Sequence, residues 1–280
     1  MKGVMMVSGS GPVWDLVHAV EMARLSHEVY KNMPYLDVSQ YGYRLVRFIE
    51  DEETGTQCMV CMGPARSYVI VFRGSSTVKD ACSDILVLKE RFTPLKKFLF
   101  SPKVHLGFQN AWESVRERVF EVINRASAGL PVRLNITGHS LGAGLATLAA
   151  ADFAKNSQHD IVLYNFGSPR VGNIHFKKAF SKLVPNCFRV VNDEDVVATI
   201  PKIGYFHIGT LVYLNGRGDL KVAPSIPEQV FENLDDLLGM MTGKFITDHC
   251  NEKYLSILED KLEGGASPVG RSTKGRDYFS

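Results

Sequence analysis

The pentapeptide Gly138-His139-Ser140-Leu141-Gly142 has the spacing Gly-x-Ser-x-Gly, which can place a serine for nucleophilic chemistry. Residues 132–137, just before it, alternate apolar and polar side chains and include β-branched ones, which predicts a strand. Residues 141–154 are almost entirely Leu, Ala and Gly, which predicts a buried helix packed closely on a sheet. Together they predict a nucleophile elbow, a sharp turn that exposes a strained serine. If Ser140 were only a helix cap, it would not need a glycine two residues to either side.

A serine hydroxyl is a poor nucleophile, so the elbow requires a base that a carboxylate orients. On an elbow scaffold these partners follow in the order Ser, Asp or Glu, His. Of the eight histidines, only His207 and His249 lie downstream of any plausible acid. His207 lies in an apolar segment that leads to a strand at 211–214, which favours a structural imidazole. His249 lies on a loop just before an amphipathic C-terminal helix, a common place for a catalytic base, so we predict His249 as the base.

The acid is expected in the cluster Asp193-Glu194-Asp195, directly after a buried strand predicted at 187–191. Ligands of open α/β sheets gather outside the carboxyl ends of the strands, so a carboxylate there is well placed. A solvated turn would account for at least two of the three carboxylates. Spacing alone does not choose between Asp193 and Asp195.

Four separated segments resemble the class 3, or fungal-type, triacylglycerol lipases of the α/β-hydrolase fold. They are Val71-Phe72-Arg73-Gly74-Ser75-Ser76, His105-Leu106-Gly107-Phe108 with Ala111-Trp112, Thr137-Gly138-His139-Ser140-Leu141-Gly142-Ala143, and Gly167-Ser168-Pro169-Arg170-Val171-Gly172-Asn173. Their order and spacing also match the family, and the resemblance extends over roughly residues 40–260.

The resemblance implies a catalytic triad of Ser140, His249 and Asp195, because the family's aspartate lies in a stretch similar to the one that ends here at Pro201. It also implies that His207 belongs to a structural Tyr-x-His-x-Gly stretch.

The resemblance further implies an oxyanion hole made by Ser75, through its backbone N–H and its hydroxyl, and by the backbone N–H of Leu141. Elbow enzymes in general take one donor from the residue after the nucleophile and another from the loop after the third strand. Arg73 is then interpreted as a structural anchor.

By resemblance, we expect a serine carboxylic-ester hydrolase that acts on acylglycerols or related lipid esters and uses no cofactor and no metal. Phospholipase and feruloyl-type esterase activities stay open, because pocket shape decides acyl preference. A non-catalytic lipase-fold binding or signalling protein is the alternative from another class. The complete set of triad and oxyanion residues favours the enzyme.

Fungal members of the family carry a short lid helix after the oxyanion segment, with an apolar residue that is often tryptophan. The corresponding residues 77–84 contain no aromatic side chain, which predicts a more polar lid or an apolar surface moved to residues 92–100. There, Lys96 and Lys97 adjoin Phe98 and Phe100, as in a transient contact with a membrane or lipid-droplet surface. The alternative is a solvated loop whose aromatic side chains pack inward.

The pattern of apolar and polar residues along the chain predicts the helices and strands that must position these residues. We expect a leading helix at 14–30, a meander of strands at 43–49, 57–62 and 67–72, a loop-rich insertion at 77–104, and a long helix at 109–128. After the elbow come strands at 161–165 and 188–191. Early antiparallel strands and later βα units predict an α/β fold with a mixed, mostly parallel central sheet covered by helices on both faces. With the resemblance this becomes an α/β-hydrolase fold with a lid-type insertion after the oxyanion segment.

Composition sets the remaining bounds. With 280 residues and 45% hydrophobic content, residues 1–263 can form one domain, and the Gly-, Ser- and charge-rich residues 264–280 are predicted to be a disordered tail. A net charge of +2 gives no reason to invoke nucleic acid. No apolar run approaches the ~20 residues that span a bilayer, and residues 1–12 lack a secretory core. We therefore expect a cytoplasmic protein, or a mature form whose leader is missing. Composition does not decide the oligomeric state.

The cysteines do not indicate a disulfide framework, because there are five of them, an odd number. Cys58-x-x-Cys61 lies in a predicted strand, where alternation would point the two side chains to opposite faces. A metal site at this pair is therefore not expected.

Overall fold

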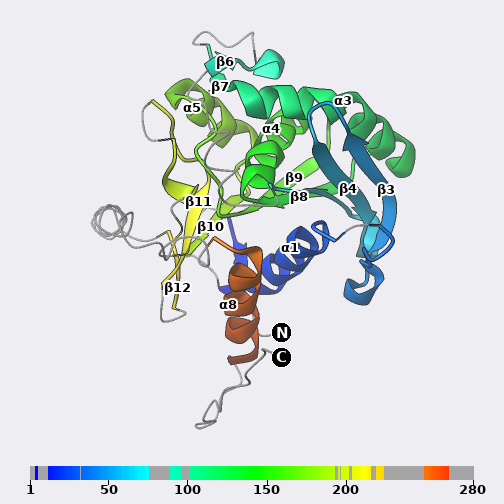
Figure 1. Ribbon diagram of the computed structural model, residues 1–280, viewed down its shortest axis with the longest axis vertical. Helices are drawn as coiled ribbons and strands as arrows, with labels where there is room; N and C mark the ends of the chain where they lie inside the picture. Colours follow the sequence, from blue (N-terminus) through cyan, green and yellow to red (C-terminus); the bar gives the residue numbers. More distant parts are fainter. Residues whose placement is uncertain are drawn as a thin grey trace.

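A mixed sheet of eight strands runs through the middle of the molecule, in the order β12-β11-β10-β9-β8-β5-β4-β3 (Figure 1). The computed structural model describes residues 4–5, 12–31, 33–75, 89–95, 101–192, 195, 197–201, 204–215, 219–223 and 249–264. The strands are β3 (Arg44–Asp51), β4 (Thr56–Met62), β5 (Tyr68–Phe72), β8 (Arg133–His139), β9 (Asp160–Phe166), β10 (Cys187–Asn192), β11 (Thr210–Leu214) and β12 (Leu220–Val222).

The pairing directions confirm the predicted mixture. β3, β4 and β5 form an antiparallel meander, whereas β5, β8, β9, β10 and β11 run parallel, and β12 returns antiparallel to β11. The parallel strands β8, β9 and β10 all end at one edge of the sheet, and Ser140 directly follows β8 there.

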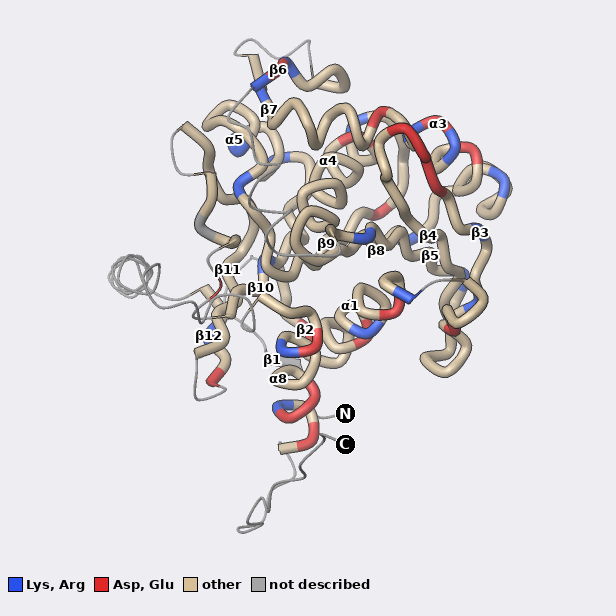
Figure 2. The backbone as a smooth tube through the Cα atoms, viewed as in Figure 1, with Lys and Arg blue, Asp and Glu red and all other residues tan. Residues whose placement is uncertain are grey.

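Helices cover both faces of the sheet and define two apolar cores. One core contains residues of α3 (Leu106–Ser127), α4 (Leu141–Asn156) and α5 (Ile174–Leu183), and the other contains residues of α1 (Leu16–Glu28) and α8 (Asn251–Gly264). Cys58 belongs to the first core and Cys61 to the second, so these two strand neighbours point to opposite faces as predicted. Charged residues are concentrated on the outer helices and on the β3–β4 hairpin (Figure 2).

Two helices begin at residues other than those expected, and a side-chain cap explains each. α1 begins at Leu16 because Asp15 accepts hydrogen bonds from the backbone N–H groups of Val17 and His18. The preceding pair of residues, β2 (Trp14–Asp15), instead forms a two-stranded sheet with β1 (Val4–Met5). α3 begins three residues earlier than expected, where the Nδ1 atom of His105 accepts a hydrogen bond from the backbone of Phe108.

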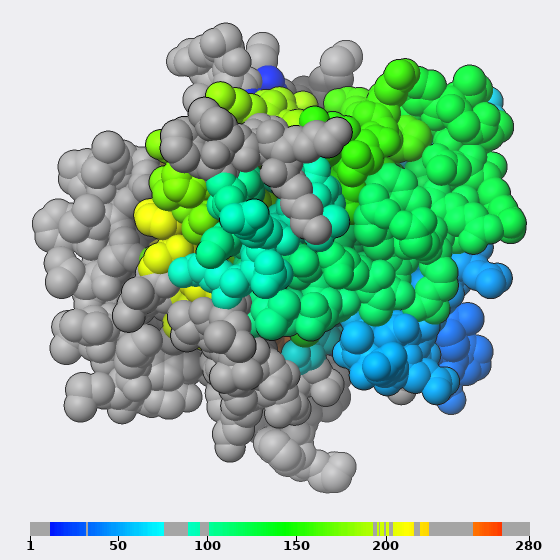
Figure 3. Space-filling view, turned by 90° about the horizontal axis from the view of Figure 1, so that it is seen from above, coloured from blue at the N-terminus to red at the C-terminus, as the bar shows by residue number. Residues whose placement is uncertain are grey.

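The segment expected to be loop-rich contains a small antiparallel hairpin, β6 (Lys89–Arg91) with β7 (Lys103–His105). Its residues, turquoise in Figure 3, lie beside the green surface of the helices. Phe92 and Leu95 are fully buried, which contradicts a surface contact through these two residues. The remaining residues of the predicted patch, 96–100, and the predicted lid at 77–84 lie outside the described residues. So do residues 265–280 of the predicted tail.

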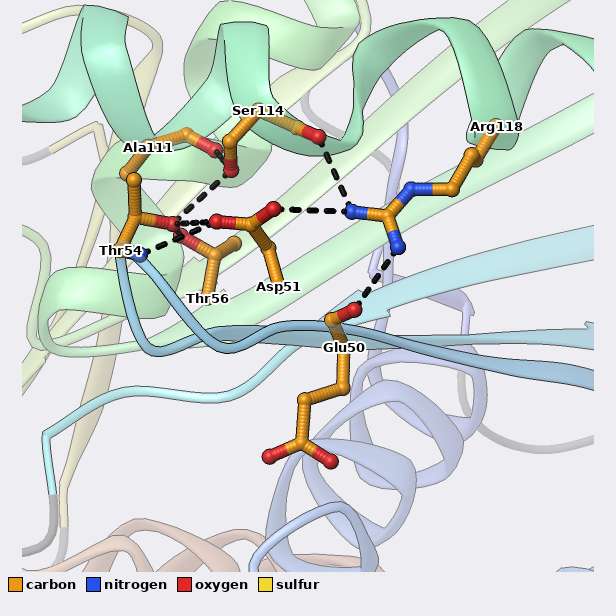
Figure 4. Close-up of polar contacts among 7 residues, drawn as sticks. All are labelled: Glu50, Asp51, Thr54, Thr56, Ala111, Ser114 and Arg118. Atoms are coloured by element: carbon orange, nitrogen blue, oxygen red, sulfur yellow. Dashed lines mark hydrogen bonds and ion pairs between the residues drawn. The ribbon is translucent and has the colours of Figure 1, made fainter.

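The turn of the β3–β4 hairpin is fixed to α3 by polar contacts (Figure 4). Asp51 accepts hydrogen bonds from the backbone and the hydroxyl of Thr54, and that hydroxyl also meets Ser114 of α3 at 2.9 Å. Arg118 of α3 donates to the carbonyl of Glu50 and to Asp51. These exposed contacts orient the antiparallel edge of the sheet against the helix and contribute little free energy of unfolding.

Within the described part of the chain, every helix is too short or too polar to cross a membrane.

Candidate active site

Ser140 lies at the junction of β8 and α4 in a strained backbone conformation, with φ +58° and ψ −128°. A Cβ on Gly138 would collide with the backbone of Gly142, and a Cβ on Gly142 would collide with the backbone of Phe72 and Arg73. The two glycines therefore allow strand and helix to approach as the predicted elbow requires. Ser140 makes no capping hydrogen bond to α4, so the simple helix-cap interpretation fails.

Asp195 and His249 form a buried hydrogen-bonded pair. The Nδ1 atom of His249 lies 2.8 Å from Oδ1 and 2.9 Å from Oδ2 of Asp195. His249 is 2% exposed and Asp195 is 1% exposed. Because a carboxylate can only accept, Nδ1 carries the proton and Nε2 of the neutral ring is left with a lone pair. Among the described residues, Nε2 has no hydrogen-bond partner.

Two further donors hold the Asp195 carboxylate. The hydroxyl of Tyr254, on α8, donates to Oδ2 at 2.5 Å, and the backbone N–H of Val197 donates to Oδ1 at 2.9 Å. Burial by itself would raise the pKa of Asp195, but the charge and hydrogen bond of His249, together with the bond from Tyr254, hold that pKa below its ordinary value. Asp195 therefore stays ionised although it is buried.

Gly167 makes room for this pair. It follows β9, has φ +55°, and its hydrogen faces the acid and the base. A Cβ there would lie 2.5 Å from Oδ2 of Asp195 and 3.1 Å from the ring of His249. Glycine is required at this position both for the left-handed conformation and for the space.

Backbone and ring contacts bring the pair to the elbow. The backbone N–H of Ser140 donates to the carbonyl of Phe166, the residue before Gly167, at 3.0 Å. His139 donates from Nε2 to the carbonyl of His249 at 2.6 Å, and the two imidazole rings lie 4.6 Å apart. The residue before Ser140 thus contacts the predicted base directly, so acid, base and serine share one corner of the sheet.

The segment after β5 lies against the elbow on the other side. A Cβ on Gly74 would be 3.3 Å from Cβ of Ser140, which places the Gly74-Ser75 peptide beside the serine. Leu141 begins α4, whose first N–H groups lack acceptors within the helix and carry its positive dipole end. Both predicted oxyanion donors therefore border Ser140. Arg73 donates to Gln57 at 2.7 Å and lies over the ring of Tyr30, in keeping with a structural anchor.

The comparison with known families agrees with this geometry. The family model described as lipase (class 3) matches residues 69–205, which contain the oxyanion segment, the elbow and Asp195. Over these residues, just under half of its length, the chain is similar to the class 3 lipase family.

Two curated relatives show how far the similarity extends. The chloroplastic phospholipase A1-Igamma1 of Arabidopsis thaliana is 27% identical over 244 residues, which covers 70% of this chain and 46% of the relative. The secreted mono- and diacylglycerol lipase 1 of Fusarium solani is 31% identical over 193 residues, which covers 64% and 54%. The chain thus spans about half the length of these relatives.

A solved lipase structure shows the shared fold. The triacylglyceride lipase of Rhizomucor miehei superposes with a TM-score of 0.69 at 21% identity, over 84% of this chain and 92% of that one. The α/β-hydrolase fold expected from the resemblance is therefore confirmed.

The sequence predicts a structural role for His207, and its contacts are compatible with that role. Its Nε2 accepts a hydrogen bond from Nε of Arg170 at 3.1 Å. Burial, followed by the nearby charges of Arg189, Arg170 and Lys177, holds the pKa of His207 well below its ordinary value. Asp193, the competing acid, lies outside the described residues.

Four residues at the site were not predicted: Tyr30, His139, Gly167 and Tyr254. Tyr254 lies on α8, which the sequence predicts only as an amphipathic helix. A buried tyrosine hydroxyl needs a hydrogen-bond partner, which was the one available signal. No local pattern reveals which distant group that partner is. Among the described residues, no group of three or more His, Cys, Asp or Glu side chains could hold a metal ion.

Proposed function

We propose that this protein is a serine carboxylic-ester hydrolase that acts on lipid esters, with Ser140 as nucleophile, His249 as base and Asp195 as the orienting acid. The observation that carries the proposal is the buried Asp195–His249 pair at the elbow, with Nδ1 of the imidazole committed to the carboxylate. That arrangement leaves Nε2 as the basic atom, which a serine hydroxyl requires.

The proposed reaction proceeds in two halves. Nε2 of His249 takes the proton of the Ser140 hydroxyl while the serine oxygen attacks the ester carbonyl. The resulting oxyanion receives hydrogen bonds from the backbone N–H groups of Ser75 and Leu141. The intermediate then collapses, the C–O bond to the alcohol breaks, and the alcohol leaves with the proton from His249. Water, deprotonated by the same histidine, attacks the acyl-enzyme. The bond between the acyl carbon and the Ser140 oxygen then breaks, His249 returns the proton to that oxygen, and the fatty acid is released.

Lipid esters are the substrate class supported by the relatives, whose names include a phospholipase A1 and a mono- and diacylglycerol lipase. We infer that acylglycerols are preferred. Phospholipids and feruloyl esters are the competing substrates within the same chemistry. A contact with a lipid surface through residues 96–100 remains part of the proposal, whereas Phe92 and Leu95 are buried and are removed from it.

The proposal is tested with a fluorophosphonate probe and a panel of esters. Wild-type protein is expected to be labelled once and to hydrolyse tributyrin, dioleoylglycerol or phosphatidylcholine, with methyl ferulate as the control for feruloyl esterase activity. Ser140→Ala should lose the labelling and retain only the small residual rate supplied by binding and the oxyanion donors. Equal labelling of both proteins would exclude Ser140. A wild-type protein that neither reacts with the probe nor hydrolyses any ester would favour the non-catalytic alternative.

A further inference from the structure

One tyrosine hydroxyl lies between the oxyanion segment and the elbow, which are separated in the sequence. Tyr30 follows α1, and its hydroxyl lies 3.1 Å from Nδ1 of His139. A Cβ on Gly74 would overlap the same hydroxyl, so the Tyr30 hydroxyl packs directly against this glycine. Through this one oxygen, Tyr30 contacts both the oxyanion segment and the elbow.

The direction of each hydrogen bond follows from the acceptors. The carbonyl of His249 can only accept, so Nε2 of His139 carries a proton. Burial, reinforced by the neighbouring His249, lowers the pKa of His139 to about 3, so the ring is neutral and its Nδ1 is an acceptor. Burial also raises the pKa of Tyr30 well above its ordinary value. The Tyr30 hydroxyl therefore remains a donor and donates to His139.

Two hydrogen bonds link Tyr30 through His139 to the backbone of His249, and the Tyr30 hydroxyl at the start of this chain packs against Gly74. We propose that Tyr30 and His139 are positioning residues that hold the oxyanion segment and the base loop in one geometry around Ser140. The Asp195 carboxylate orients the imidazole of His249 through its ring nitrogen. The Tyr30–His139 pair orients the same residue through its carbonyl, from the opposite side of the elbow.

A neutral His139 suits this task. Its ring lies 4.6 Å from that of His249, so a second positive charge there would oppose protonation of the base during the reaction. A ring that stays neutral and donates to the carbonyl supports His249 without competing for its proton. Losing such support from the surrounding shell typically reduces activity about 10- to 100-fold.

The proposal rests on the proposed ester hydrolase activity, and it is tested first by removing a single oxygen. Tyr30→Phe should lower kcat about 10-fold on p-nitrophenyl butyrate, normalised to phosphonate-titrated active sites, while KM changes by less than about twofold. Tyr43→Phe is the matched control. The hydroxyl of Tyr43 donates to Glu21 of α1 and does not contact the site. That variant should keep the wild-type kcat.

Conservative replacement separates positioning from packing. His139→Gln retains an N–H donor at a similar reach, whereas His139→Leu retains none, so the Gln variant should keep more kcat than the Leu variant at equal amounts of titrated sites. Tyr30→Phe combined with His139→Leu should be less harmful than the product of the two single effects, because both act on one chain of bonds.

Nitrogen-15 NMR of histidine-labelled protein gives a readout that does not depend on activity. We expect one His139 ring signal from a protonated Nε2 and one from an unprotonated Nδ1 between pH 5 and 8, and we expect the Nδ1 signal to move in Tyr30→Phe. An Nδ1-protonated ring would overturn the proposal, as would a wild-type kcat in Tyr30→Phe when Ser140-dependent hydrolysis is intact. Absence of hydrolysis and labelling in the wild type would instead overturn the proposed function, and this proposal with it.

Discussion

At the scale of single residues, Asp195 shows how hydrogen-bond donors keep a buried carboxylate ionised and oriented. It is reached by the ring of His249, the hydroxyl of Tyr254 and the backbone N–H of Val197. A buried ion without such partners would be strongly destabilising and would tend to take up a proton. The three donors therefore keep Asp195 charged and fix its direction toward Nδ1 of His249.

The Tyr254 hydroxyl can be tested by Tyr254→Phe, which removes one hydrogen bond to a charged group. Such a bond contributes about 1.5–3 kcal/mol, so kcat should fall about 10- to 100-fold with KM little changed. The measurement is steady-state hydrolysis of p-nitrophenyl butyrate beside a thermal unfolding curve. Tyr68→Phe is the control, because its buried hydroxyl donates to the carbonyl of Ala126, away from the site. If both variants lose only thermal stability, Tyr254 has no part in orienting the acid.

At the scale of elements, the ends of β8, β9 and β10 supply the serine, Gly167 and the segment leading to Asp195. The parallel strands place these ends at one edge, and the left-handed turn at Gly167 carries the chain away without filling the space that the acid and base occupy. The base itself comes from the start of α8, which packs on α1 through ion pairs such as Arg24 with Glu259 at 2.7 Å. The site therefore depends on how α8 is docked as well as on the sheet.

Gly167→Ala is expected to impair catalysis beyond its effect on stability. The new methyl group would collide with Asp195 in addition to straining the backbone at φ +55°. Gly129→Ala is the matched control, because Gly129 has φ +71° and no atom within 4 Å of the added Cβ. Both variants should lose about 1 kcal/mol of unfolding free energy from backbone strain. Only Gly167→Ala should also lose kcat at least ~10-fold, as a displaced triad member would. Equal kcat in the two variants would contradict this.

At the scale of the whole molecule, buried neutral histidines make the fold sensitive to acid. The pKa of His139 falls from its ordinary 6.5 to about 3 in the folded state, mainly through burial, and that of His207 is also lowered by burial. The unfolded chain therefore binds more protons than the folded one below pH 6.5, so the free energy of unfolding decreases as the pH falls from 6.5 toward 3. Asp195 adds to this only at lower pH, where carboxylates titrate.

Chemical denaturation at pH 7 and pH 5 measures this effect. His139 alone should account for a loss of about 2 kcal/mol between these two pH values. His139→Gln, which has no titrating ring, should start less stable at pH 7 but lose about 2 kcal/mol less on acidification. A pH dependence identical to that of the wild type would show that the ring of His139 is not buried and neutral.

The sequence by itself predicted the local elements and the candidates for the main site residues. Apolar alternation predicted strands near those observed, and the glycines on either side of Ser140 predicted a turn that only glycine allows. The order Ser, acid, base reduced the choice of histidine to two, because chain order is a property of the scaffold. These inferences succeed because side-chain periodicity and backbone sterics act over a few residues.

Only the tertiary structure decided which distant groups share the site. Tyr30, just after α1, and Tyr254, on α8, meet it on one face of the sheet, far in sequence from Ser140. Only the tertiary structure also reveals the β6–β7 hairpin. Its three-residue strands pair with each other and are too short to leave a periodic pattern in the sequence. Hydrogen-bond partners and burial arise when separate elements pack together, and the same packing sets the lowered pKa values of His139 and Asp195. No local spacing encodes these contacts, since their free energy exists only once the sheet has brought the elements side by side.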